Sequence, residues 1–343
     1  MTVKFADIKD TERIDSFIAS SGSSSFYHKY LWSSVIEKSF GHKYYCLLSE
    51  NNEKKVNGLL PMVHMRNLIF GNMLVSMPYF NYGGVCAEED KEKELLIQES
   101  IQLAKKLNAK YIEYRQVGNL NNEFPVKKHK VSMRLALPVT PEELWKSFPS
   151  KLRSQIKRSQ KEEMSVRIGR NDELDNFYRV FSLCMRNLGT PVYPKHFFKN
   201  ILECFPENTW ICSVYVGNLS VASGFLAGFK NRLEIPWAAA DSRYNRFSPN
   251  MLLYWSCLRF ACEKGFIEFD FGRSTVGGGT YKFKEQWGAV PSQLFWYYWL
   301  RDGGTVPEVT PRNPKYDLAI ALWKKLPVSI TRTLGPHIIK NIP

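Results

Sequence analysis

The segment Phe266-Ile-Glu-Phe-Asp-Phe-Gly272 alternates apolar and acidic residues, which is typical of a β-strand with two different faces. It follows a helical pattern from about Pro249 to Lys264 that closes at Gly265. Two strand patterns precede that helix, Val216-Gly-Asn-Leu-Ser-Val-Ala-Ser-Gly-Phe-Leu-Ala-Gly228 and Leu233-Glu-Ile-Pro-Trp-Ala-Ala-Ala240. This order of strand, strand, helix and strand predicts an α/β unit.

The same order of signals occurs earlier in the chain. A strand over Lys55–Met62 and the stretch Ser76–Gly84 lead to a helical pattern from roughly Glu89 to Leu107, and Tyr111-Ile-Glu-Tyr-Arg115 follows as a strand. Ile112-Glu-Tyr-Arg115 therefore holds the place that Ile267-Glu-Phe-Asp270 holds in the second copy. The long period predicts a duplicated α/β (α+β) fold, in which each half has a mixed twisted sheet flanked by helices.

The length of 343 residues is about twice that of a typical domain, which agrees with a duplication. We predict a first domain over residues 1–138 and a second over 139–305. The second would contain a basic helix at 150–163. Residues 306–343 would form a C-terminal tail that packs on the globular body.

The chain is basic, with 47 Lys and Arg against 33 Asp and Glu and a net charge of +14. A field of that sign favours anionic partners such as nucleic acid, a phosphate-linked precursor or an acidic lipid surface; simple solubility is the alternative. The seven cysteines form no Cys-x-x-Cys pair, and the six histidines lack metal-ligand spacing, so we expect reduced thiols and no metal. The N-terminal residues do not resemble a signal peptide, and we expect a cytoplasmic protein.

Two features could bind an anion. The segment over residues 149–161 reads as a helix whose basic side chains are Lys151, Arg153, Lys157 and Arg158; an anion-binding face and a solvated surface both fit it. The second helix begins with Ser248 as a potential cap, followed by Pro249 and Asn250. Amides at such a helix start can bind an anion, although an ordinary cap looks the same in sequence.

The most specific motif is Phe269-Asp-Phe-Gly-Arg-Ser-Thr-Val-Gly-Gly-Gly-Thr-Tyr-Lys-Phe-Lys-Glu-Gln-Trp-Gly288. It resembles the FemAB family, particularly the FemAB-like proteins found with exosortase and extracellular-polysaccharide systems. Leu74-Val-Ser-Met-Pro-Tyr-Phe-Asn-Tyr-Gly-Gly84 and Ser248-Pro-Asn-Met-Leu-Leu-Tyr-Trp255 agree with it, as does the basic segment. The resemblance covers nearly the whole chain.

The resemblance implies two tandem GNAT-like (acetyltransferase) domains. Family members studied as enzymes transfer an aminoacyl group from tRNA to an amine on a peptidoglycan precursor. We therefore expect an acyltransferase that forms an amide on a cell-envelope or polysaccharide precursor. The expected donor is aminoacyl-tRNA or a similar activated acyl group, and no bound cofactor is expected. The family's Phe-Lys pair corresponds to Phe283 and Lys284, and the family's lysine is implicated in catalysis.

Amide formation from an ester or thioester requires stabilisation of a tetrahedral oxyanion. Lys284 can supply a fixed positive charge for this purpose, in a site enclosed by Tyr281, Phe283 and Trp287. The alternative is a surface lysine on an edge strand, where Lys282 and Lys284 would share one face. Further expected substrate-binding residues are Arg273, Ser274, Asn250, Lys151, Arg153, Lys157 and Arg158.

Asp270 and Glu268 place two carboxylates on one face of a central strand. A buried carboxylate is costly without a partner. Asp270 therefore either accepts a proton from the acceptor amine or pairs with Arg273, and we favour the ion pair.

Two other functions remain open. The first is a thioester-dependent N-acyltransferase that uses acyl-CoA or a carrier protein. The stretch Arg243–Asn250 weighs against ordinary coenzyme A use, because it contains no glycine where GNAT proteins have a glycine-rich pyrophosphate loop. The second is a non-catalytic binding module. The tail carries Lys324, Lys325 and Arg332 beside apolar residues, so a peripheral contact with the inner membrane face is also open.

Overall fold

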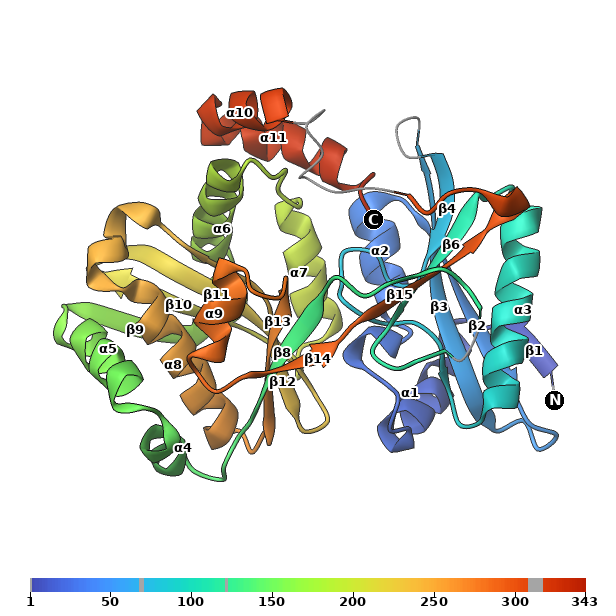
Figure 1. The fold of residues 1–343 in the computed structure, drawn as a ribbon, viewed down its shortest axis with the longest axis horizontal. Helices are drawn as coiled ribbons and strands as arrows, with labels where there is room; N and C mark the ends of the chain where they lie inside the picture. Colours follow the sequence, from blue (N-terminus) through green and yellow to red (C-terminus); the bar gives the residue numbers. More distant parts are fainter. Residues whose placement is uncertain (1, 68–70, 121–122, 308–316) are drawn as a thin grey trace. The chain divides into compact units, whose positions relative to one another are not determined.

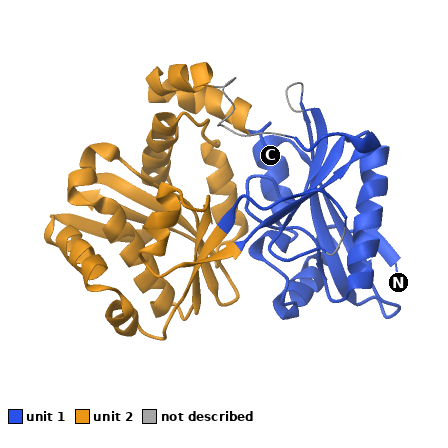
Figure 2. Ribbon diagram, in the orientation of Figure 1, with its two compact units in different colours: residues 1–131, 293–309, 340–343 blue, residues 132–292, 310–339 orange. Residues whose placement is uncertain are grey.

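The computed structural model describes residues 2–67, 71–120, 123–307 and 317–343 (Figure 1). The chain divides into two compact units, shown in Figure 2. Unit 1 comprises residues 1–131, 293–309 and 340–343, and unit 2 comprises residues 132–292 and 310–339.

Unit 1 contains a sheet with the strand order β1-β2-β3-β4-β6-β15-β7, and β5 pairs with β3 outside this path. Its strands are β1 (Thr2–Phe5), β2 (Lys43–Glu50), β3 (Val56–Asn67), β4 (Gly71–Val75), β5 (Cys86–Ala87), β6 (Tyr111–Gln116), β7 (Val126–Lys127) and β15 (Phe295–Leu300). The pair β4–β6 is parallel, whereas the other neighbours along the path are antiparallel. The sheet is therefore mixed, as predicted.

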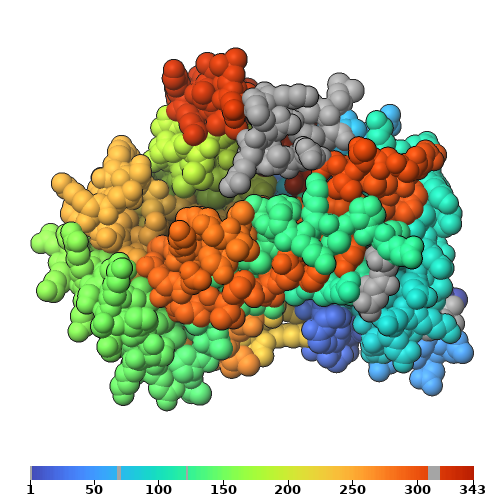
Figure 3. All heavy atoms as spheres, in the orientation of Figure 1, coloured from blue at the N-terminus to red at the C-terminus, as the bar shows by residue number. Residues whose placement is uncertain are grey.

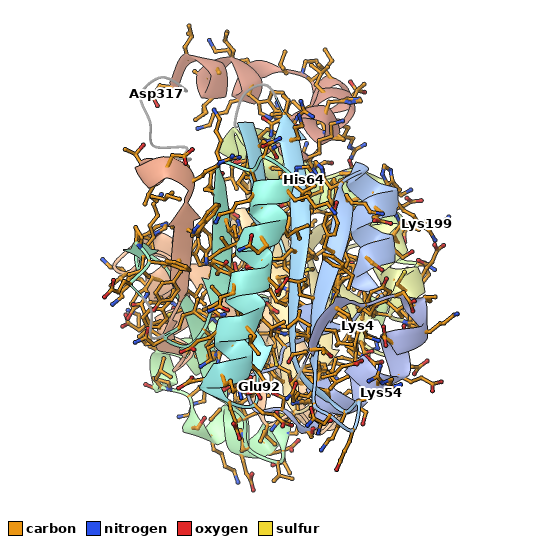
Figure 4. All side chains as sticks on the ribbon, turned by 90° about the vertical axis from the view of Figure 1, so that its right-hand side faces the viewer. Lys4, Lys54, His64, Glu92, Lys199 and Asp317 are labelled. Carbon is orange, nitrogen blue, oxygen red and sulfur yellow. The ribbon has the colours of Figure 1, made fainter. Side chains whose placement is uncertain are left out.

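Helices of unit 1 contact its sheet through apolar side chains. α1 (Thr11–Ser20) contacts β3, and α2 (Trp32–Phe40) contacts β2. α3 (Asp90–Lys106) lies along the sheet in Figure 4, and its Leu96 and Leu103 join a core cluster with residues of β2, β3, β4, β6 and β15. α3 starts at a capping box, in which Glu92, labelled in Figure 4, accepts from the backbone N–H of Glu89. The predicted helix over residues 89–107 is confirmed.

Unit 2 contains a sheet with the order β14-β8-β13-β12-β11-β10-β9. Its strands are β8 (Val131–Ala136), β9 (Met164–Gly169), β10 (Thr209–Val216), β11 (Leu219–Phe229), β12 (Arg232–Ala240), β13 (Glu268–Ser274) and β14 (Val290–Gln293). The pair β12–β13 is parallel, and the pairs from β9 to β12 are antiparallel.

The helices of unit 2 are α4 (Pro141–Ser147), α5 (Ser150–Lys161), α6 (Leu174–Leu188), α7 (Lys195–Cys204), α8 (Pro249–Glu263), α9 (Gly279–Glu285), α10 (Asp317–Lys325) and α11 (Val328–Ile339). α6 and α8 both contact strands β10, β11 and β12, and α5 packs on α8. The predicted helix from Pro249 and the predicted basic helix are both present, and their ends differ from the prediction by one or two residues.

The two sheets have the same arrangement of strands. In each sheet, four antiparallel strands lead to one parallel pair, and two further strands follow that pair. In unit 1 that pair is β4–β6, and α3 lies between the two strands in the chain; in unit 2 it is β12–β13, and α8 lies between them. Ile112 lies in β6, and Ile267 immediately precedes β13. The predicted duplication is therefore confirmed in the topology.

Two strands differ from the predicted domain boundaries. β15, which we assigned to the second domain, lies in the sheet of unit 1, where Trp296 pairs with Arg115. β8, which we assigned to the first domain, is a neighbour of β13 in the sheet of unit 2. A strand takes the place where its side chains and backbone groups find partners, and that place need not be near in sequence.

Of the predicted tail, residues 308–316 lie outside the described residues. α10 and α11 both contact α6. Arg186 of α6 donates to the carbonyl oxygens of Lys324 and Leu326, and Arg332 of α11 donates to Ser182 Oγ. These contacts hold the two tail helices on unit 2.

We expect Gly335→Ala to lower the melting temperature by several degrees. A Cβ atom at residue 335 would lie 2.8 Å from the backbone nitrogen of Val192 and 3.0 Å from its oxygen, so α11 would have to shift. Such overpacking costs about 1–3 kcal/mol, which exceeds the gain of up to about 1 kcal/mol from replacing a helical glycine. The matched control is Gly22→Ala, because no atom lies within 4 Å of a Cβ at residue 22. Equal melting temperatures for the two variants would contradict this account of how α11 packs.

Candidate active site

The parallel strands β12 and β13 separate part-way along their length. Their pairing runs from Arg232 with Glu268 to Glu234 with Asp270, and within the described stretch 232–274 no ladder pair follows, although β12 continues to Ala240 and β13 to Ser274. The local sequence explains the separation. β12 contains an irregularity against β11 between Glu234 and Trp237, where Pro236 has no N–H to donate.

β13 is also distorted at this point. Gly272 has φ +75°, which only glycine adopts without strain, and its N–H donates to Asp270 Oδ1 at 2.7 Å. The two distortions open a gap between parallel strands in the middle of the sheet. Backbone groups that face such a gap must find other partners.

Lys284 supplies one of these partners from α9. Its Nζ donates to the carbonyl oxygen of Gly272 at 2.9 Å and to that of Arg273 at 3.0 Å. The side chain is buried, with 7% of its surface exposed. Two of the three ammonium donors are used in these bonds, so a third N–H is left for a substrate oxygen.

Burial lowers the pKa of Lys284 to about 8, and the negative charges of Asp270 and Glu234 oppose this effect. The ammonium is thus charged at neutral pH and becomes neutral within a mildly alkaline range. The predicted alternative, a surface lysine on an edge strand, is wrong: residues 279–285 form a helix, and Lys284 is on its buried side.

Asp270 is fully buried and interacts with groups from β8. Its Oδ1 accepts from Ser132 Oγ at 2.5 Å, and its Oδ2 lies 3.6 Å from Nε of Arg134. The predicted pair with Arg273 is corrected here, because the guanidinium beside Asp270 is that of Arg134, whereas Arg273 is exposed. Glu268 on the same face of the strand pairs with Arg232.

An open pocket of about 270 Å³ lies between α5, α9 and the start of α8. Its lining residues are Gln155, Arg158, Ser248, Met251, Phe283 and Gln286. Oε1 of Gln155 is buried and has no hydrogen-bond partner within the part of the chain that the structure describes. A ligand donor could satisfy it. In the space-filling view of Figure 3, α5 (green) and α9 (orange) both lie on the face of unit 2 toward the viewer.

The pocket agrees in part with the predicted anion site. Arg158 lines it, whereas Lys151, Arg153 and Lys157 are not among the lining residues. Ser248 occupies the predicted N-cap position of α8 and Pro249 the first helical position, but the Ser248 side chain makes no capping bond. Ser248 has φ +55°, which directs its side chain differently from that of an ordinary cap.

The other predicted substrate-binding residues differ in their surroundings. Trp287 is buried and forms aromatic contacts with Phe148, Tyr254 and Phe283, so it belongs to the core beneath the site. Ser274, at the end of β13, is buried, and its Oγ has no hydrogen-bond partner among the described residues. Phe283, Tyr281 and Asn250 are half-buried, and only Phe283 of these lines the pocket.

The corresponding position in unit 1 is closed. After the last β4–β6 pair, Val75 with Glu113, the backbone of Ser76 donates to Glu113 and that of Gly83 donates to Arg115. Nη1 of Arg115 also donates to the carbonyl of Phe80 at 2.7 Å. The loop over residues 76–83 therefore fills the place where unit 2 has its gap.

Comparison with known proteins agrees with this architecture. Residues 146–285 match the model of the acetyltransferase (GNAT) domain, and none of the curated proteins matches the chain. The crystal structure of FemX is similar over 93% of this chain and 100% of its own, with 13% identity and a TM-score of 0.68. The chain has a tandem GNAT fold.

Two further solved structures share this tandem fold. L-PGS from Bacillus licheniformis is 14% identical, with a TM-score of 0.56, over 96% of this chain and 99% of its own. A tandem GNAT protein from the clavulanic acid biosynthesis pathway is 8% identical, with a TM-score of 0.53, over 89% of this chain and 100% of its own. The predicted fold is confirmed, and Asp270 and Lys284 lie within the matched residues, whereas Ser132 and Arg134 precede them.

Several features of the site were missed by the sequence analysis. Ser132 and Arg134 reach Asp270 from a strand that is more than a hundred residues away, and Gln155 and Gln286 are ordinary surface residue types. Pro236 within a strand pattern was a usable signal, because proline interrupts a central strand. Within the described ranges, no group of three or more His, Cys, Asp or Glu side chains is placed to hold a metal ion.

Proposed function

We propose that this protein is an N-acyltransferase that forms an amide from an activated acyl group and an amine, with the reaction at the gap between β12 and β13. The observation that carries the proposal is Lys284, a buried cation bonded to the carbonyls of Gly272 and Arg273 with a third donor left. A charge held in this way needs no reorganisation when a neighbouring oxygen becomes negative.

The chemical steps follow from this arrangement. The neutral amine attacks the carbonyl carbon of the ester or thioester, and the carbonyl oxygen becomes an oxyanion beside the Lys284 ammonium. The C–O or C–S bond then breaks, and the leaving oxygen or sulfur takes the proton that the amine loses. Asp270 is a positioning residue in this scheme, because both its oxygens are engaged by Ser132, Gly272 and Arg134.

The pocket beside α5 favours an anionic donor. Arg158 brings a positive charge to it, and it lies at the start of α8, where backbone N–H groups attract negative charge. Aminoacyl-tRNA and acyl-CoA both present phosphates. We favour aminoacyl-tRNA, with a cell-envelope or polysaccharide precursor as the acceptor, because the Phe283-Lys284 motif resembles that of FemAB proteins and η3 (Ser242–Phe247) contains no glycine.

A donor screen tests this proposal. The protein is incubated with charged tRNA or with acyl-CoA and a set of amine acceptors, and the products are detected by mass spectrometry. An aminoacylated product with tRNA alone supports our choice, whereas a product only with acyl-CoA supports the thioester alternative. Binding of a donor without any product, in a screen that includes envelope precursors, would favour a binding module and contradict the proposal.

Replacing Arg158 with Ala should weaken donor binding on the order of tenfold, because a charge-assisted contact to a phosphate is lost. The slope of log Kd against the logarithm of the salt concentration should decrease by about one. Turnover at saturating donor should be nearly unchanged. Lys161→Ala is the matched control, since Lys161 is an exposed cation on the same helix and does not line the pocket. Equal donor affinities for the two variants would place the donor elsewhere.

A further inference from the structure

The two tail helices of unit 2 expose apolar side chains. On α10, Leu318 and Leu322 lie one turn apart and are 73% and 57% exposed. On α11, Ile330, Leu334 and Ile338 follow at four-residue spacing and are 42%, 46% and 39% exposed. We call these five residues the tail stripe. Scattered apolar residues are common on protein surfaces, but here five follow helical spacing on two consecutive helices.

The side of each helix opposite the tail stripe packs on unit 2, so the stripe points outward. Thr331, Gly335 and Ile339 of α11 are buried, and Ile320 of α10 packs against Gly189 at the end of α6. Each helix thus already has an apolar side toward unit 2, and the tail stripe is a second one. In Figure 3, the atoms of α10 (red) lie at the edge of unit 2.

Positive charge predominates around the stripe. Asp317, which is exposed at the start of α10, is the one acidic residue of the described segment 317–343, whereas Lys324 and Lys325 are exposed in the last turn of α10. Exposed apolar side chains beside a net positive charge complement a surface that is apolar inside and negative outside. An anionic bilayer has both properties.

We propose that α10 and α11 dock on an anionic membrane surface, with the tail stripe at the acyl boundary and the lysines near the phosphate groups. The docking is peripheral: among the described residues, no helix is long and apolar enough to cross a membrane. This inference does not depend on the proposed catalytic activity.

Flotation of the full-length protein with vesicles tests the docking. Wild-type protein should float with vesicles of phosphatidylcholine and phosphatidylglycerol, and far less with phosphatidylcholine alone. Lys324→Gln/Lys325→Gln should reduce the partition coefficient by about tenfold or more, because each lysine near an anionic surface contributes about a factor of five. Leu318→Ser/Leu322→Ser should reduce it by at least as much.

Matched variants separate these effects from a general loss of charge or apolar surface. Lys105→Gln/Lys106→Gln removes an adjacent exposed lysine pair from the last turn of α3, and it should bind as the wild type does. Ile8→Ser/Val139→Ser removes two apolar residues that are 64% and 86% exposed, with the same expectation. All variants change exposed side chains, and circular dichroism checks that they fold.

Three results would overturn the proposal. The first is wild-type protein that fails to float with anionic vesicles, and the second is tail variants that float as well as wild type. The third is a wild-type dimer in sedimentation velocity that Leu318→Ser/Leu322→Ser converts to a monomer, which would assign the stripe to a second copy of the chain.

Discussion

Lys284→Met is expected to lower turnover on the order of a hundredfold or more, while the affinity for the donor changes much less. The ammonium beside the gap acts on charge that develops only in the transition state, so its loss affects kcat rather than binding. The variant should fold with reduced stability, because the carbonyls of Gly272 and Arg273 lose a donor, which costs roughly 1–3 kcal/mol. Steady-state kinetics and thermal melts measure the two effects separately.

The control for this prediction is Lys282→Met on the same helix. Lys282 is exposed, and its substitution should leave both kcat and the melting temperature close to those of the wild type. If Lys284→Met turns over substrate at the wild-type rate, the charged group has been assigned to the wrong residue.

The pH dependence gives a second measure of the Lys284 charge. The pKa of Lys284 is lowered to about 8, so the ammonium is present below that pH and is lost as the pH rises through it. The activity of the wild type should therefore fall above about pH 8. Lys284→Arg keeps its charge to much higher pH, and whatever activity it retains should lack this alkaline decline. If the activity of the wild type, but not that of Lys284→Arg, rises through pH 8, the neutral form of Lys284 would instead be the active one.

Asp270→Asn is expected to destabilise unit 2 by about 3–5 kcal/mol, because it removes a fully buried negative charge beside the guanidinium of Arg134, whose side chain is only 14% exposed. Denaturant unfolding measures this loss directly, without knowledge of the substrate. The hydrogen bonds that Ser132 and Gly272 donate do not offset this loss, since their acceptor becomes a neutral amide oxygen in place of a carboxylate.

Glu268→Gln provides the matched comparison two residues earlier on the same face of β13. Glu268 and Arg232 are each partly exposed, at 30% of their side-chain surface, and such pairs contribute about 0–1 kcal/mol. A stability loss for Asp270→Asn no larger than that for Glu268→Gln would mean that Asp270 is not held by a buried ion pair. Its role as a proton acceptor would then need to be tested.

The repeated order of strands and helices could be predicted from residue patterns alone. Local periodicity predicted α3, α8 and α5 to within about two residues, because the residues that decide a helix lie within a few turns of one another. The Phe283-Lys284 motif also directed attention to the region of the candidate site, since a resemblance to a family is a property of the sequence alone.

The strands that complete each sheet, and the groups that surround the site, became apparent only in the folded chain. β8 and β15 take places beside β13 and β6, and no local signal identifies a strand's partner when the partner lies far along the chain. The counter-ion of Asp270 is Arg134 rather than the sequence-near Arg273 for the same reason. The position of Lys284 depends on carbonyls that are released only when β12 and β13 separate. Hydrogen bonds and ion pairs form between groups that are close in space, and the folded sheet sets those distances.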